Sequence, residues 1–141
     1  MKTTTIHVGL ILVALYGGVL RAAEQAKEVT VESVPPVVIK TVPEAGAQDV
    51  DPKLTELKAT FSKDMKDGSW SWATKFPLEN FPKMDGKARY LADKRTCVLP
   101  VKLEPGKTYA LWLNTEKYLN FRDAAGLPAI PYLLVFKTKS N

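Results

Sequence analysis

The sequence has 141 residues and a formal net charge of +5 at pH 7, from 20 basic and 15 acidic side chains. A chain of this length has room for one domain with a single hydrophobic core. The basic residues are spread along the chain and form no concentrated stripe, which argues against a nucleic-acid partner. Cys97 is the only cysteine, so an intramolecular disulfide is excluded.

Residues 1–22 have the layout of a secretory signal peptide. Lys2 supplies a positive start, a mostly apolar run covers residues 8–15, and small residues lie around Ala22. The apolar run is shorter than the roughly 20 residues that a membrane-spanning helix needs, so we favour cleavage over the alternative of an uncleaved anchor. The sequence therefore predicts a secreted, periplasmic or cell-envelope protein with no stable membrane span after cleavage.

The rest of the chain reads as a linker followed by an all-β domain. Residues 23–36 are polar and end in two prolines, which is typical of a linker. From residue 37 to 141, seven short segments with β-like alternation are separated by turn residues, at residues 37–42, 55–62, 69–74, 88–92, 95–103, 107–114 and 132–138. This pattern predicts an Ig-like β-sandwich of about seven antiparallel strands. Two long connections, 75–87 and 115–131, are expected as loops, the second with one helical turn around residues 117–122.

The clearest architectural signal is the corner between two of these segments. Leu103 ends the first, a turn containing Pro105 and Gly106 follows, and Tyr109 lies just inside the next. A buried tyrosine at this point can donate its hydroxyl to the backbone a few residues upstream, as in the tyrosine corner of β-sandwiches. These four residues are therefore assigned a structural role, and Tyr109→Phe is expected to leave a backbone acceptor unpaired.

Cys97 shares the apolar face of its segment with Leu99 and Val101. We therefore interpret it as a small buried hydrophobe and not as a reactive thiol.

Five motifs, in this order, resemble the bacterial Ig-like domains first described in the S-layer protein SbsA. They are P-x-x-G-x-x-x-V from Pro43, F-S-x-x-M from Phe61, L-x-P-G-x-x-Y from Leu103, D-x-x-G from Asp123 and F-x-T from Phe136. The resemblance covers roughly residues 38–138 and implies an exported Ig-like sandwich. It implies no activity, because the family supplies spacers and binding modules and a fold does not determine a function.

The residues expected after cleavage offer little for catalysis. The only histidine, His7, lies in the predicted signal peptide, which removes Ser-His-Asp and Cys-His mechanisms and any imidazole metal site. The aspartates lie in turns, where they cap backbone amides. We expect no enzyme, no catalytic residue and no cofactor. Calcium is the one ion with candidate oxygen ligands, in the turns at residues 49–51 and 64–67, but turn capping is the favoured interpretation.

Aromatic residues are the candidate binding residues. Trp70 and Trp72 share one face of their segment and could form a platform for sugar rings or an anchor for a protein. The alternative, which we favour for at least one of them, is a place in the sandwich core. Trp112, a separate exposed candidate, and Tyr118 and Phe121 complete the set of candidate binding residues. The alternative is that Trp112 packs under the 115–131 loop with Tyr118 and Phe121.

These observations predict an exported, non-enzymatic Ig-like domain that binds another envelope or secreted protein as an adhesion or adaptor module. The alternative is a carbohydrate-binding module that uses the tryptophans to bind a polysaccharide. An accessory subunit of a secreted enzyme is a third interpretation.

Overall fold

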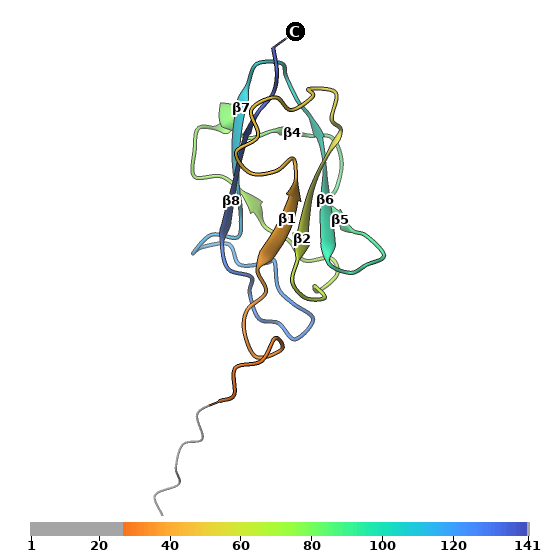
Figure 1. Ribbon diagram of the computed structural model, residues 1–141, viewed down its shortest axis with the longest axis vertical. Coiled ribbons are helices and arrows are strands. Elements are labelled where there is room, and N and C mark those ends of the chain that lie inside the picture. The colour runs from red at the N-terminus through yellow and green to blue at the C-terminus, as the bar shows by residue number, and fades with distance from the viewer. Residues whose placement is uncertain (1–26, 141) are drawn as a thin grey trace, which may run out of the picture.

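The computed structural model describes residues 27–140, and the predicted signal peptide lies outside them. Two antiparallel sheets face each other and enclose the core (Figure 1), which confirms the predicted all-β sandwich. The described N-terminal segment leaves the sandwich at the end opposite the C-terminus. Within residues 27–140, no helix has the length and apolar character needed to cross a membrane.

The first sheet has the strand order β1-β2-β6, with β4 and β5 both pairing with β6, and the second has the order β3-β7-β8. The strands are β1 (Val38–Val42), β2 (Glu56–Phe61), β3 (Trp72–Ala73), β4 (Lys83–Met84), β5 (Arg89–Tyr90), β6 (Thr96–Lys102), β7 (Thr108–Leu113) and β8 (Tyr132–Lys137). A short 3-10 helix, η1 (Leu78–Asn80), precedes β4. Each predicted segment contains one strand, and β4 is an additional strand within a predicted loop.

The helical turn expected around residues 117–122 is absent from the structure, so that prediction is wrong. The hydroxyl of Thr115 accepts hydrogen bonds from the backbone amides of Lys117, at 3.2 Å, and Tyr118, at 3.1 Å. Such a side-chain turn offers these amides a local partner in place of a helical carbonyl.

Alternation along β2 and β6 builds one wall of the core. Leu57 and Ala59 of β2 are fully buried and lie opposite Leu99 and Cys97 of β6. Cys97 is buried as predicted, and its burial raises the pKa of the thiol to about 12. The thiol is therefore protonated at neutral pH and is a poor nucleophile.

Aromatic rings fill the space between the sheets. The ring centroid of Phe61 lies 5.0 Å from that of Phe121, and the centroid of Tyr109 lies 5.4 Å from that of Phe136. All four side chains are buried. A buried aromatic ring removes a large apolar area from water, so these pairs contribute strongly to the packing of β2, β7, β8 and the 115–131 loop.

The tyrosine corner is present, but its hydrogen bond runs opposite to the predicted direction. The Tyr109 hydroxyl accepts a hydrogen bond from the backbone N–H of Glu104, at 2.8 Å, so the prediction of a backbone acceptor was wrong. The turn between Leu103 and Tyr109 uses Gly106 at a φ of 67°, a left-handed conformation that glycine adopts without strain. Pro105 precedes this glycine, and the turn directs the Glu104 amide toward the tyrosine.

Replacing Tyr109 by phenylalanine is expected to destabilise the domain by about 1–2 kcal/mol, because the Glu104 N–H loses its acceptor. Urea unfolding at constant pH measures the change. Tyr118→Phe is the matched control, since Tyr118 is 51% exposed and its hydroxyl has no hydrogen-bond partner among the described residues. Equal unfolding midpoints for the two variants would show that the corner bond contributes no stability.

Candidate binding cleft

A cleft of about 600 Å³ opens on one side of the sandwich, between β3 of the second sheet and the β4–β5 edge of the first. One wall is a run of consecutive residues, 70–74, and the opposite wall contains Met84 and residues 86–88. Leu99 of β6 also lines the cleft, as do Tyr118 and Asn120. This volume lies in the range of about 300–1,000 Å³ that is typical of ligand sites.

Two serines determine how the β3 wall is held. Ser69 Oγ donates to the carbonyl of Asn120, while Ser71 Oγ accepts from the Asn120 amide at 3.0 Å. The Ser71 carbonyl also accepts from the amide of Asn114, at 3.1 Å, which continues the pairing with β7. The serines thus fasten the segment to the 115–131 loop and to β7, and the tryptophans that alternate with them line the cleft.

Trp72 belongs both to the cleft and to the core. Its indole is half-buried and meets the Phe121 ring edge-on, with 5.5 Å between ring centroids and an interplanar angle of 79°. Its Nε1–H approaches the Cys97 sulfur but makes no regular hydrogen bond with any described residue. The prediction that at least one of the two indoles packs in the core therefore fits Trp72.

Trp70 lies at one end of the cleft, half-buried beside β5. Its ring centroid is 6.3 Å from that of Tyr90, and the Nζ of Lys87 lies 5.8 Å from the Trp70 centroid. The Tyr90 hydroxyl donates to the carbonyl of Ser69 at 3.2 Å. Burial raises the pKa of this hydroxyl far above its usual value, which keeps the donor protonated. These contacts tie β5 to the segment before β3.

Lys87 is the one charged residue among the described residues that line the cleft. No carboxylate in the described part of the chain lies within ion-pair distance of its ammonium group. By contrast, Arg89 and Lys102 nearby pair with Glu56 at 2.7 Å and Asp85 at 3.1 Å. The cleft is thus an apolar surface with a single uncompensated cation.

The remaining aromatic candidates lie in different places. Tyr118 lines the cleft with Trp70 and Trp72. Trp112 does not line it; its half-buried ring lies under the Lys75 ammonium, 5.2 Å from the ring centroid. Phe121 has an exposed fraction of 0%, so it cannot contact a partner in the folded domain, and its place in the binding set is corrected to a core position.

The wall opposite the tryptophans was missed from the sequence, including Met84 and Lys87. Met84 is 58% exposed, and together with Lys87 it lies in the 75–87 segment, which was interpreted only as a long loop. Gly86, between them, has a φ of 149°, and a Cβ there would approach Pro100 Cγ to 3.3 Å. The two prolines of the 75–87 loop are the one sequence signal for this wall, and they do not specify where the loop lies.

The acidic turns serve as local caps. Asp51 Oδ1 accepts from the amide of Lys53 at 3.0 Å, and this bond lowers the pKa of the Asp51 carboxyl. Asp67 caps Gly68 at 2.8 Å, and Asp64 pairs with Arg95 at 2.8 Å. Within residues 27–140 there is no group of three or more His, Cys, Asp or Glu residues placed to hold a metal ion.

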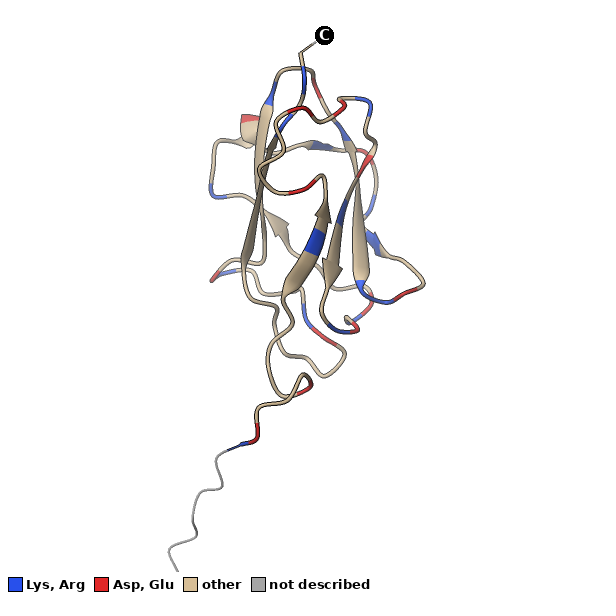
Figure 2. Ribbon diagram, in the orientation of Figure 1, with Lys and Arg blue, Asp and Glu red and all other residues tan. Residues whose placement is uncertain are grey.

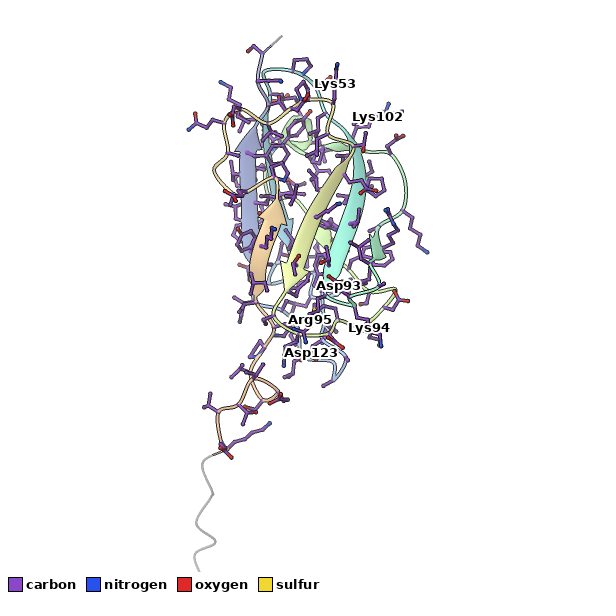
Figure 3. All side chains as sticks on the ribbon, turned by 45° about the vertical axis from the view of Figure 1, so that its right-hand side comes forward. Lys53, Asp93, Lys94, Arg95, Lys102 and Asp123 are labelled. Atoms are coloured by element: carbon purple, nitrogen blue, oxygen red, sulfur yellow. The ribbon has the colours of Figure 1, made fainter. Side chains whose placement is uncertain are left out.

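Charge of both signs is distributed over the whole domain. Figure 2 shows basic and acidic residues interspersed along the loops and strands, without a continuous stripe of one sign. Figure 3 shows Arg95 and Asp123 at the end where the N-terminal segment emerges, and Lys53 and Lys102 at the other.

Comparison with known proteins gives one family match. Residues 32–138 match the family model described as "Bacterial Ig-like domain". Among solved structures, the S-layer protein rSbsC(31-844) is similar at a TM-score of 0.43 and 16% identity, over 75% of this chain and 14% of that one. Domains 1-6 of the surface layer protein SbsC give a TM-score of 0.44 and 16% identity, over 77% of this chain and 14% of that one. The chain thus spans a small part of either structure, and no curated protein matches it.

Proposed function

The chain belongs to the bacterial Ig-like domain family, and on this premise we propose that it is an exported, non-enzymatic module that binds another envelope or secreted protein. It acts as an adhesion or adaptor domain at the cell envelope. The observation that carries the proposal is the cleft formed by Trp70, Trp72 and Met84 between the sheet edges. The sandwich is the scaffold, and the function lies in this site.

The apolar character of the cleft supports a protein partner. Exposed apolar surface that is grouped at one place typically marks an interaction site, whereas scattered apolar residues do not. Trp is enriched among the residues that contribute most to protein–protein binding, and Met is enriched in such interfaces. Met84, at 58% exposed, and the two half-buried indoles supply this combination.

A carbohydrate is the second candidate ligand, because Trp70 and Tyr118 are aromatic rings at the cleft surface. A sugar ring stacks on an open aromatic face and takes hydrogen bonds from polar side chains around it. Here the Lys87 ammonium lies over the Trp70 ring, at 5.8 Å, and the Lys117 ammonium lies 5.5 Å from the centroid of Tyr118. Since a cation occupies a position over each ring, the protein partner is favoured.

Met84→Glu is expected to weaken partner binding at least tenfold, because it places a carboxylate on the apolar wall. Full-length protein is used as bait on a solubilised envelope fraction, and the retained protein is titrated against each variant. The matched control is Leu78→Glu, which makes the same kind of change at a site that is 80% exposed and outside the cleft. The control is expected to bind as the wild type does.

Two results would overturn the proposal. If polysaccharide alone is retained, and Met84→Glu loses it while Leu78→Glu keeps it, the domain is a carbohydrate-binding module. If both variants retain the same protein equally well, the partner binds elsewhere and the cleft is not the site.

A further inference from the structure

We propose that the partner enters the cleft as an extended peptide strand that pairs with the free edge of β3. This inference rests on the proposed function, because it concerns how the same cleft is occupied. It adds the conformation and the chemistry of the partner segment: a strand that presents an apolar side chain to the cleft and a carboxylate to Lys87.

The hydrogen-bond pattern of β3 shows which of its backbone groups are free. β3 is the edge of its sheet, and in the described part of the chain it pairs with β7 alone. The amide of Asn114 donates to the carbonyl of Ser71 at 3.1 Å, so these two residues form a hydrogen-bonded pair. Bonded and non-bonded pairs alternate in an antiparallel ladder, so the next pair, Trp72 with Leu113, is non-bonded.

The N–H and C=O of Trp72 therefore point away from β7, toward the open edge. No described residue outside the strand ladders bonds to either group. Strand edges with unpaired backbone groups are templates for another strand, and many peptide-recognition domains use them in this way.

The cleft follows the direction of this edge. Its wall is a continuous run of the chain, residues 70–74, so the cleft extends along β3 and is not a pit at its end. A peptide paired with the edge would advance by about 3.3 Å per residue and turn alternate side chains toward the same face. Those side chains would meet the apolar surface formed by Trp72, Met84 and Leu99.

The charge of Lys87 indicates which kind of residue flanks the apolar side chain of the incoming peptide. Lys87 lines the cleft without an ion-pair partner among the described residues, whereas Arg89 pairs with Glu56 and Lys102 with Asp85. Lys83 of β4 also has no ion pair among these residues, but it does not line the cleft. A carboxylate on the incoming peptide would form an ion pair with the Lys87 ammonium, and this charge complementarity would favour acidic partners. The peptide class is therefore extended, apolar and acidic.

The test uses a display library of random linear nine-residue peptides, selected on the full-length protein and counter-selected on Met84→Glu. The selected peptide is then resynthesised with single N-methyl groups at successive amides. Strand pairing predicts at least a tenfold loss of affinity at alternate amides and little change at the amides between them. Hydrogen exchange of the Trp72 amide should slow at least tenfold on binding, while that of Ala73, already in the β7 ladder, should change little.

Lys87→Glu should weaken the selected peptide at least fivefold. Its matched control is Lys40→Glu, because Lys40 lies on β1 at the opposite edge of the first sheet. The control should leave the affinity unchanged.

The outcomes separate this inference from the proposed function. If the selected peptides require Met84 but bind equally well with an N-methyl group at any amide, the cleft is the binding site but strand pairing is wrong. If no cleft-dependent peptide is selected, yet an envelope protein is still lost by Met84→Glu, the partner offers a folded surface and the inference is wrong. If the Trp72 amide is already protected in a dimer without peptide, a second copy covers the edge, which also overturns it. If the library yields no cleft-dependent peptide and the envelope fraction yields no protein whose binding depends on Met84, the proposed function is wrong as well.

Discussion

Asn114→Ala is expected to destabilise the domain by about 4 kcal/mol. Asn114 is completely buried at the end of β7. Its Nδ2 donates to the carbonyls of Phe121, at 2.9 Å, and Ala129, at 3.0 Å, and its Oδ1 accepts from the Phe121 amide at 2.9 Å. Alanine leaves two buried backbone groups unpaired, the Phe121 N–H and the Ala129 C=O, each at a penalty of about 1–3 kcal/mol. The Phe121 C=O loses one of its two donors and keeps the Ala129 N–H, at 2.8 Å.

The backbone adds a second reason. Asn114 has a φ of 62°, in the left-handed region that asparagine tolerates better than alanine does. Asn114→Gly removes the same hydrogen bonds without this strain, so it should be more stable than Asn114→Ala by about 1 kcal/mol. Comparing the two variants separates the amide contribution from the conformational one.

Guanidinium unfolding measures the free energy of each variant. The control is Asn120→Ala, since Asn120 is an exposed asparagine in the same loop and its side chain makes no hydrogen bond with any described residue. A difference below 1 kcal/mol between Asn114→Ala and Asn120→Ala would show that the buried amide does not hold the loop. That loop positions Tyr118 and Asn120 in the cleft, so the result also shows whether the Asn114 amide supports the binding site.

The predictable parts of the fold are the strands whose core-facing apolar residues recur at a spacing of two. β2, β6, β7 and β8 were placed to within two residues, because a period of two in apolar residues specifies both the strand and its inward side. β4 was missed because both of its residues, Lys83 and Met84, are exposed and no alternation marks them. It is a strand through backbone pairing with β6 alone.

The same distinction applies to the cleft. Trp70 and Trp72 share a face at a spacing of two residues, so their common side could be predicted. Met84 and Lys87, on the opposite wall, depend on the path of a loop without periodicity. Phe121 was included among the candidate binding residues, whereas the Asn114 amide holds its loop against the end of the sandwich and buries the ring. A contact of this kind leaves no local pattern in the sequence.

Lys63→Met is expected to destabilise the domain by about 3 kcal/mol, because it leaves the carboxylate of Asp123 buried without its partner. Lys63 Nζ lies 2.7 Å from Asp123 Oδ2, and the exposed fractions of the two side chains are 11% and 4%. The same ammonium donates to the carbonyls of Glu32, at 3.1 Å, and Val34, at 2.6 Å. The substitution should therefore also free residues 32–34, which limited proteolysis with N-terminal sequencing of the product would detect as a new cut site.

The pH dependence of stability identifies the ion pair as the cause. Burial alone would raise the pKa of the Asp123 carboxyl, but hydrogen bonds from Lys63 and from the Leu127 and Ala125 amides, with the lysine charge, outweigh burial and lower it. The unfolded chain then takes up the proton first on acidification, at the ordinary aspartate pKa of about 3.9. The stabilisation is present above that pH and is lost as the pH falls through the lower, folded pKa.

Urea unfolding at pH 5, 4 and 3 should therefore show a steeper loss of stability for the wild type than for Asp123→Asn, whose amide does not titrate. The lowered pKa values of exposed carboxyls, such as those of Asp51 and Asp93, give the wild type and Asp123→Asn the same background slope of stability against pH. The deficit of Lys63→Met relative to the wild type should shrink over the same interval, because protonation removes the pair from the wild type too. A deficit that stays constant from pH 5 to pH 3 would mean that Lys63 stabilises the fold through its bonds to the 32–34 carbonyls and its packing, and not through the Asp123 carboxylate.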